Sequence, residues 1–562
     1  MNRTKRSYFL PILILAFVYA GYVLFPLGRM VWESLHTDEV FTLENYVQAL
    51  DPRSSANLEA VWNSVYVSVL SVVFSGVVGI LFAFVFTQCD FPLRGVLSRV
   101  AVLPIALPPL VGVIAFLFVF GESGILPRVV EWLLGARASS VALEGLSAIV
   151  AIHTYSFSVY FYLFASTALR SLDASQLEAA GSFGASQGRI FRQIVLPELK
   201  PAIIGASVLT FMTSMASFSA PLLFGGDKRF MTLQIYNAKL NGEIGLAATY
   251  AVGLTIISLL FFVLLRTVGH SSEKRSMKGA TRSGRIRISP GLRRLLIASS
   301  LLIMAIEILP ILTIVLISFA KEGAWTWQII PHQYTMENYG KLLSDPRVFE
   351  PIINSTLMSV ITVAAAVVVG VAVAYLLTKG NLGRWRTTGE TLAALPFAIP
   401  GTVIAIALIL AFNMPSIFSA FNVLVGTFWI LPLAYFVRMF PMVVRSTSAS
   451  LEHVDSSLME AGETFGAGLW TRFRKILLPL IAPGIVSGAL LVMITALGEF
   501  VSSVLLYSYA NRPIAVEILA QMRTYNFGAA AAYSVFLLVF ILALVALANA
   551  ISRERTLTTP EL

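Results

Sequence analysis

Apolar runs long enough to cross a lipid bilayer occupy most of this chain of 562 residues. A helix of about 20 apolar residues spans the hydrocarbon core of a membrane. Two groups of six such runs can be placed, near residues 8–30, 60–87, 96–120, 144–170, 200–224 and 245–266, and near residues 295–319, 352–378, 391–412, 417–444, 481–506 and 528–551. The sequence therefore predicts an all-α integral membrane protein with about twelve transmembrane helices.

The composition disfavours several other classes of protein. Hydrophobic residues make up 57% of the chain and charged residues only 12%, whereas an ordinary soluble domain carries about 25% charged residues. A soluble enzyme, a disordered scaffold and a secreted disulfide-rich protein are therefore disfavoured. The single cysteine, Cys89, excludes an intrachain disulfide and a multi-thiolate metal site. The five histidines show no ligand spacing, so we expect no metal site.

Basic residues predict the orientation in the membrane, because Lys and Arg concentrate in cytoplasmic loops. The segment 266–294 holds nine basic residues against one acid, Glu273, and Arg3, Lys5 and Arg6 precede the first run. Both termini and the central linker are therefore expected in the cytoplasm, with membrane lipid around the helices. The net charge of +10 is assigned to these loops and not to nucleic-acid binding.

The two groups of helices form an internal repeat. Short motifs return at offsets of 291 to 293 residues: Glu44-Asn45-Tyr46 as Glu337-Asn338-Tyr339, Asn63-Ser64 as Asn354-Ser355, and Leu103-Pro104 as Leu395-Pro396. After the third helix the offset falls to 282, so the first copy carries about ten extra residues within 121–143, on the outer side. Asn63 and Asn354 are expected to form hydrogen bonds between helices.

The repeat divides the chain into two similar halves. We predict a first six-helix half at 1–268, a basic cytoplasmic linker at 269–294 and a second six-helix half at 295–562. Two halves of the same polarity are related by an axis along the membrane normal. This arrangement favours a transport protein with a pathway between the halves, although gene duplication alone would also leave a repeat.

The most informative segment lies between the fourth and fifth helices of each half, on the basic side. The first copy, 173–201, contains DASQLEAAGSFG and then IVLP, and the second, 455–483, contains DSSLMEAGETFG and then ILLP. Thirteen residues recur unchanged at the offset of 282. Both copies are too polar to insert into a membrane and too similar to be arbitrary loops.

The spacing within each copy predicts local structure. Ser175 and Glu178 have the spacing of a capping box, which starts a helix, and the second copy repeats it. Gly184 then allows a turn with positive φ, and Leu196-Pro197 ends the pattern before the next span. We predict a short helix, a turn and a second short helix across the cytoplasmic face.

This pattern resembles the EAA loop of permeases in bacterial ATP-binding-cassette (ABC) importers. In that family the loop forms a coupling helix that sits in a cleft of the ATPase subunit. The resemblance implies a type I ABC importer permease fold. It also implies the following ATPase-coupling residues: Glu178, Ala179, Gly184, Leu196 and Pro197 in the first loop, and Glu460, Ala461, Gly466, Leu478 and Pro479 in the second. The second loop departs from the family pattern at Gly462, where alanine is usual, and two ordinary amphipathic connecting helices are the alternative.

The phosphate-binding motif G-x-x-x-x-G-K-[ST] is absent from the chain, so ATP and Mg²⁺ must be bound by another polypeptide. We expect a transport subunit that is not an enzyme and has no cofactor of its own. The resemblance implies two copies of an ABC ATPase and a periplasmic or lipid-anchored substrate-binding protein as partners. It also implies a location in the bacterial cytoplasmic (inner) membrane.

The fused layout also bears on the substrate. A single-chain permease with two complete halves most resembles the ferric-iron family of binding-protein-dependent importers, which implies iron(III). Thiamine and aminoethylphosphonate permeases share this layout and remain alternatives. An ion-driven secondary transporter or a channel would fit the hydropathy equally well, but neither explains the duplicated loops.

Ionisable residues within membrane spans are candidates for the translocation pathway. Glu307 lies in the first span of the second half, and Glu499 lies in the fifth, where the first half has Ser217. A lone carboxylate would suit a cationic substrate, but pairing with a neighbouring helix is the more ordinary role. Pro108 and Pro400 are expected to kink helices that line the pathway.

Overall fold

The structure is a computed structural model that describes residues 9–37, 40–51, 55–135, 141–269, 286, 289–380, 382–383 and 385–557. Most of the predicted linker 269–294 and the basic residues Arg3, Lys5 and Arg6 lie outside these ranges. The described residues are predominantly helical, and one two-stranded antiparallel ribbon pairs His36 with Phe41.

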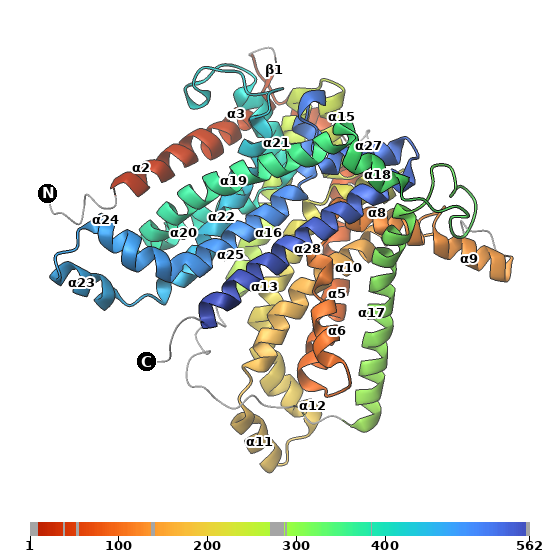
Figure 1. Cartoon of the computed structure of the whole chain (residues 1–562), viewed down its shortest axis with the longest axis horizontal. Helices are drawn as coiled ribbons and strands as arrows, with labels where there is room; N and C mark the ends of the chain where they lie inside the picture. Colours follow the sequence, from red (N-terminus) through yellow and green to blue (C-terminus); the bar gives the residue numbers. More distant parts are fainter. Residues whose placement is uncertain are drawn as a thin grey trace. The chain divides into compact units, whose positions relative to one another are not determined.

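The elements follow one another with few long loops (Figure 1). Up to the linker they are α2 Phe9–Val18, the π-helical turn η1 Tyr19–Leu24, α3 Phe25–Ser34, β1 His36–Thr37, β2 Val40–Phe41, α4 Glu44–Ala49, α5 Ser55–Gln88, α6 Arg94–Val100, α7 Leu103–Ala106, α8 Pro109–Phe120, α9 Ile125–Leu134, α10 Gly145–Arg170, α11 Ala174–Ser182, α12 Gln187–Ile190, η3 Phe191–Val195, α13 Leu196–Met215, α14 Ser219–Phe224, α15 Met231–Leu240 and α16 Ile244–Gly269. After it they are α17 Pro290–Ser318, α18 Glu337–Ser344, α19 Pro346–Lys379, α20 Trp385–Ala398, α21 Gly401–Phe412, η5 Ile417–Ser419, α22 Ile430–Glu452, α23 Ser456–Thr464, α24 Leu469–Arg472, η6 Phe473–Leu477, α25 Leu478–Leu497, α26 Val501–Leu506, η7 Tyr509–Asn511, α27 Ile514–Arg523 and α28 Phe527–Leu557.

The all-α membrane architecture is confirmed, with a different number of spans from the expected twelve. Within the described residues, 10 helices are long and apolar enough to cross a membrane, or 11 if α20 and α21, bent by 94°, count as one span. The run expected at 417–444 instead forms α22, which begins at Ile430. Arg438 and Arg445 make this helix more polar than its neighbours, so it does not qualify by composition.

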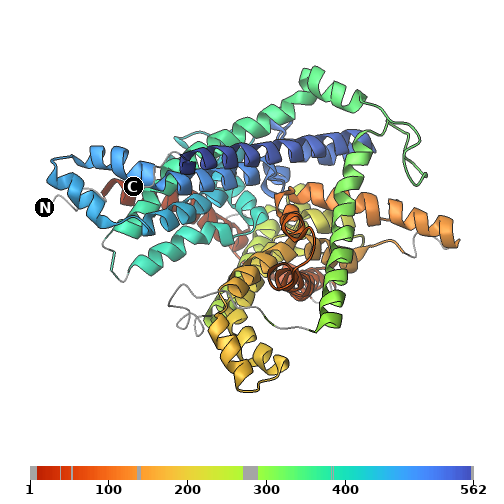
Figure 2. The same cartoon turned by 60° about the horizontal axis from the view of Figure 1, so that its bottom comes forward.

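Contacts divide the chain into two compact units. Unit 1 comprises Met1–Tyr46, Glu243–Val252 and Met336–Leu562, and unit 2 comprises Val47–Gly242 and Gly253–Thr335. The first span of each predicted half therefore packs in the unit built mainly from the other half. In unit 1, α3 packs on α21 and α2 on α19, and in unit 2, α17 packs on α8 and α5 (Figures 1 and 2). The boundaries at 268 and 295 stay predictions about the sequence repeat.

In unit 1 a single aromatic side chain fastens the first span. The ring of Phe418, which follows α21, lies 5.9 Å from that of Phe17 and 5.3 Å from that of Phe25, measured between centroids. Tyr22 donates a hydrogen bond to the carbonyl of Phe418 over 3.0 Å. Gly21 makes room for this ring, because an added Cβ would overlap it. The span is thus held by packing that requires a glycine.

In unit 2, α9 lies within the extra residues 121–143 of the first half and contacts the segment that follows α17. Arg128 of α9 donates hydrogen bonds to the carbonyl of Thr326 at 2.7 Å and to that of Gln328. Its guanidinium lies 5.1 Å from the ring centroid of Trp325, which in turn meets Phe118 edge-on. The part of 121–143 that forms α9 therefore has a structural role.

The repeated Asn-Ser pairs bond to the chain where two short helices begin, and the carbonyls that the asparagines reach lie in the loops just before these helices. Asn63 donates to the carbonyl of Arg229 at 3.0 Å, and Asn354 donates to that of Arg512 at 3.2 Å. The adjacent hydroxyls of Ser64 and Ser355 accept the first helical amides of α15 and α27. Each pair thus positions a short helix against a long span.

Candidate functional site

Each half carries the same helical hairpin between the two helices that the sequence predicts as its fourth and fifth spans. In unit 2, α11 ends in a turn at Gly184, and the chain continues as α12, η3 and α13. In unit 1, α23 ends at Gly466 and continues as α24, η6 and α25. We call residues 173–201 the first coupling module and 455–483 the second. Figure 1 shows α11 with α12, and α23 with α24, each at one end of the long helices of its own unit.

Both glycine turns have the geometry that the sequence predicts. Gly184 has a φ of 75° and Gly466 a φ of 78°, a conformation that side chains with a Cβ rarely adopt. The next residue closes the turn, since the amide of Ala185 bonds the carbonyl of Ala180 at 3.0 Å, and the second module repeats this bond. In each module this bond and the bond from the glycine amide to the carbonyl three residues earlier together form a Schellman ending of the helix. An added Cβ would meet nothing within 4 Å at either glycine.

The predicted capping box is wrong, because the N-cap lies two residues earlier. The side chain of Asp173 accepts the amide of Ser175 at 2.9 Å, and that of Asp455 accepts the amide of Ser457 at 2.9 Å. Asp and Ser both cap helices well, and here the aspartate occupies the cap and the serine lies inside the first turn. The hydrogen bonds from Ser457 hold the pKa of the Asp455 carboxyl below its usual range.

The predicted interruption at Leu-Pro is also wrong. Pro197 lies in the first turn of α13, directly after η3, and the helix continues without a break from Gln187 to Met215. The π-helical turn explains the continuity, since the amide of Leu196 bonds the carbonyl of Phe191, five residues earlier. A wider turn accommodates a proline that donates no hydrogen bond. The second module repeats this at Pro479.

Most of the predicted coupling residues lie on the surface of the modules. Exposed side chains or backbone are found at Glu178, Ala179, Gly184, Leu196, Pro197, Glu460, Ala461, Gly466 and Pro479, and Leu478 is half-buried. Beside them the rings of Phe183 and Phe465 are 91% and 89% exposed. This phenylalanine recurs in both copies of the sequence, but nothing in the sequence pattern marks it as exposed. Each module thus presents an uncovered aromatic side chain next to its glycine turn.

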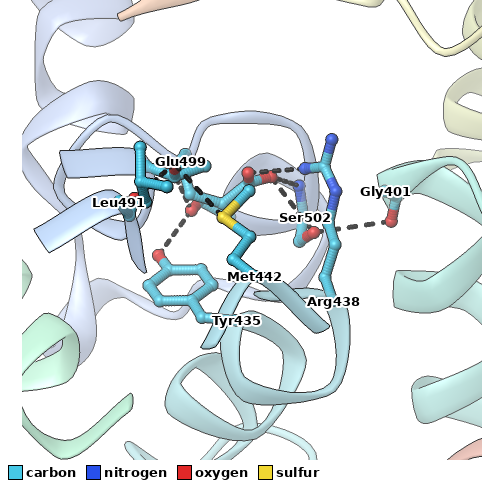
Figure 3. A network of polar contacts seen from close by, with 9 residues as sticks. Gly401, Tyr435, Arg438, Met442, Leu491, Glu499 and Ser502 are labelled. Carbon is cyan, nitrogen blue, oxygen red and sulfur yellow. Dashed lines mark hydrogen bonds and ion pairs between the residues drawn. The ribbon is translucent and has the colours of Figure 1, made fainter. Parts of the chain in front are cut away.

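Glu499 does not stand alone, because Arg438 of α22 pairs with it (Figure 3). The guanidinium lies 2.6 Å from one carboxylate oxygen, and Ser502 donates its amide to the other at 3.0 Å. The hydroxyl of Ser503 links the backbone of Glu499 to Tyr435. Glu499 therefore has the more ordinary of the two roles considered from the sequence, pairing with a residue of another helix 61 positions away.

The first half carries a network of histidine and serine side chains at the equivalent place. His153, which corresponds to Tyr435 at the offset of 282, has one ring nitrogen 2.9 Å from the hydroxyl of Ser71 and the other 2.9 Å from that of Ser217. Ser217 follows the end of α13 as Glu499 follows the end of α25. The two halves thus use different chemistry at matched breaks in the fifth span.

The remaining pathway candidates are Glu307, Pro108 and Pro400, and they belong to three different parts of the fold. Glu307 is buried on α17 in unit 2. Pro108 and Pro400 are the residues just before α8 and α21. The expected kink at Pro400 is a full break, since α20 and α21 meet at 94°. No group of three or more His, Cys, Asp or Glu side chains that could hold a metal ion occurs in the described residues.

Comparison with known proteins decides the family. A profile described as "Binding-protein-dependent transport system inner membrane component" matches residues 75–278 and again 366–556. The chain belongs to this family. Its two matches make it a permease with two fused repeats.

Several similar proteins are also described as transport permeases. A probable ABC transporter permease from Sinorhizobium fredii is 28% identical over 99% of both chains. A ferric transport system permease from Actinobacillus pleuropneumoniae is 25% identical over 95% of this chain and 76% of that protein. The molybdenum transport permease of Escherichia coli is 32% identical over 39% of this chain and 96% of that protein. The permease is thus an ABC importer component, which is a transport subunit and not an enzyme.

Proposed function

We propose that the permease is driven by two ABC ATPase subunits that dock on the first and second coupling modules. The observation that carries this proposal is the duplicated geometry of the two hairpins: a capped helix, a glycine turn with an exposed phenylalanine, and a direct helical connection into the fifth span. A continuous helix transmits a displacement of the hairpin to the membrane span. ATP and Mg²⁺ are bound by the partner, and closure of the ATPase dimer moves both modules.

The substrate that fits best is iron(III), delivered by a periplasmic or lipid-anchored binding protein. Support comes from the ferric transport permease that resembles this chain over most of its length. Glu499 contributes no net negative charge, because Arg438 pairs with it, so Glu307 is the carboxylate left among the pathway candidates for a cation. Ser217, Pro108 and Pro400 complete that candidate set. The permease lies in the inner membrane with both termini in the cytoplasm.

Uptake in cells tests the substrate. A bacterial host that lacks its own ferric importers would express the permease with the ATPase and binding protein that co-purify with it, and ⁵⁵Fe(III) uptake would be measured with and without an uncoupler. We expect ATP-dependent uptake that survives collapse of the proton gradient. Uptake of molybdate, thiamine or aminoethylphosphonate in place of iron would overturn the substrate, and uptake that follows the ion gradient would favour a secondary transporter.

A further inference from the structure

The two coupling modules differ at three positions that lie together in space. In the second module these are Gly462, Glu463 and Arg472, and at the offset of 282 the first module has Ala180, Gly181 and Ile190 instead. Both sets lie where the coupling helix packs against the start of the fifth span. The internal repeat therefore offers a natural comparison of two ways to hold the same helix.

In the first module the contact is apolar. Ile190 and Leu177 are 4% and 8% exposed and belong to a cluster of buried apolar side chains, against which Ala180 and Ile194 also pack. Apolar contacts of this kind hold α11 without directional bonds.

In the second module an arginine occupies the same place. Arg472 is only 9% exposed. Because a guanidinium is rarely buried unless it has polar partners, we expect Arg472 to contact such groups. One of its terminal nitrogens lies 2.6 Å from the carboxylate of Glu463 and 3.2 Å from the carbonyl of Met459, both in α23. The side chain thus ties α23 to the turn that leads into α25.

Gly462 is what lets this arginine fit. The residue is buried, and an added Cβ would lie 2.7 Å from Cδ1 of Ile476 and 3.2 Å from Cγ of Arg472. An alanine here, as in the first module, would push against the stem of the arginine. The glycine weakens helix propensity but provides the space for that stem.

From this geometry we infer that Gly462, Glu463 and Arg472 form a clamp that positions the second coupling helix, and that the two ATPase-docking modules are held by different forces. The clamp acts on α23 and through it on the ATPase contact, so its role in coupling rests on the proposed function. Arg472 is a positioning residue, because its polar contacts are made within the module.

Amide hydrogen exchange and ATPase activity test the clamp in the full permease with its ATPase in lipid nanodiscs. Arg472→Ile removes both polar contacts and leaves the space at Gly462 unfilled. We expect several-fold faster exchange at 456–464, unchanged exchange at 174–182, and weaker stimulation of ATP hydrolysis by the permease. Lys475→Gln, which introduces the residue of the first module outside the clamp, is the control for exchange and should leave it unchanged at 456–464.

A triple variant separates positioning from direct contact. Gly462→Ala, Glu463→Gly and Arg472→Ile together recreate the apolar packing of the first module, so slow exchange and ATPase stimulation should return. Unchanged exchange in Arg472→Ile would overturn the clamp. A triple variant that stays as impaired as Arg472→Ile would show that Arg472 touches the ATPase itself. Failure of the wild-type permease to retain any ATPase would refute the proposed function and leave the exchange test of the clamp intact.

Discussion

The pair of Arg438 and Glu499 makes one side chain depend on the other. Arg438→Met leaves the carboxylate, whose side chain is 5% exposed, without a counter-charge. Breaking a buried ion pair costs about 3 kcal/mol or more, and the partial exposure of Arg438 places the expected loss at the low end of that range. Thermal unfolding of the detergent-solubilised permease should show a lower midpoint. Arg438→Met with Glu499→Gln should recover part of the loss, and a single variant as stable as wild type would show that the pair is dispensable.

Gly21 should be intolerant of larger residues. Leucine at this position would overlap the ring of Phe418, and overpacking costs about 1–3 kcal/mol. We expect Gly21→Leu to loosen α2 from unit 1, measured as faster proteolysis near the N-terminus. Adding Phe418→Ala removes the obstacle and should restore part of the protection. Gly28, where a Cβ would meet nothing within 4 Å, provides the control as Gly28→Ala.

At the scale of single elements, the glycine turns offer a sharp test of the coupling modules. Gly184→Val has open space for its side chain but must hold a positive φ, which is costly for a β-branched residue. We expect transport to be lost while membrane insertion and expression remain. Gly188→Ala is the matched control, because this position is also open but lies in α12 without a positive φ. Normal transport in Gly184→Val and the corresponding Gly466 variant would contradict the coupling role.

The cap of α23 should respond to pH. Hydrogen bonds from Ser457 lower the pKa of Asp455, so the ionised cap stabilises the helix above the ordinary carboxyl pKa of about 3.9, and this contribution is lost as pH falls through the lower folded-state pKa. A spin label at Phe465→Cys, with Cys89→Ala, should gain mobility as the pH is lowered toward 3. Asp455→Asn, which keeps a capping oxygen, should be insensitive to pH over this range, whereas Asp455→Ala should be mobile throughout.

Some elements of the structure can be predicted from the sequence and others cannot. Hydropathy and the repeat predict the membrane helices and locate both coupling modules, because these signals are local. The cap at Asp173 escapes prediction because two good capping residues lie two positions apart. The turn at η3 leaves no recognisable pattern. The partner of Glu499 lies on another helix, and hydropathy says nothing about which helices meet.

For the whole molecule, the composition of the two units makes a prediction about folding. Each unit draws its outer helix from the other half of the chain, α2 with α3 in one case and α17 in the other. A chain cut within the linker, between residues 269 and 289, should yield two fragments that are each degraded when expressed alone. Expressed together they should complement and restore a stable permease, measured by membrane levels and co-purification. A first fragment that is stable by itself would contradict this dependence.

The exchange of first spans also bears on how such a chain diversifies. A polypeptide of one repeat would complete its packing only by pairing with a copy of itself, and every substitution would then appear on both sides of the pair at once. Joining the copies in one polypeptide fixes their ratio and lets each side change alone. The first half has Ile190 where the second has Arg472, and His153 where the second has Tyr435. A symmetric pair of identical chains cannot differ in this way.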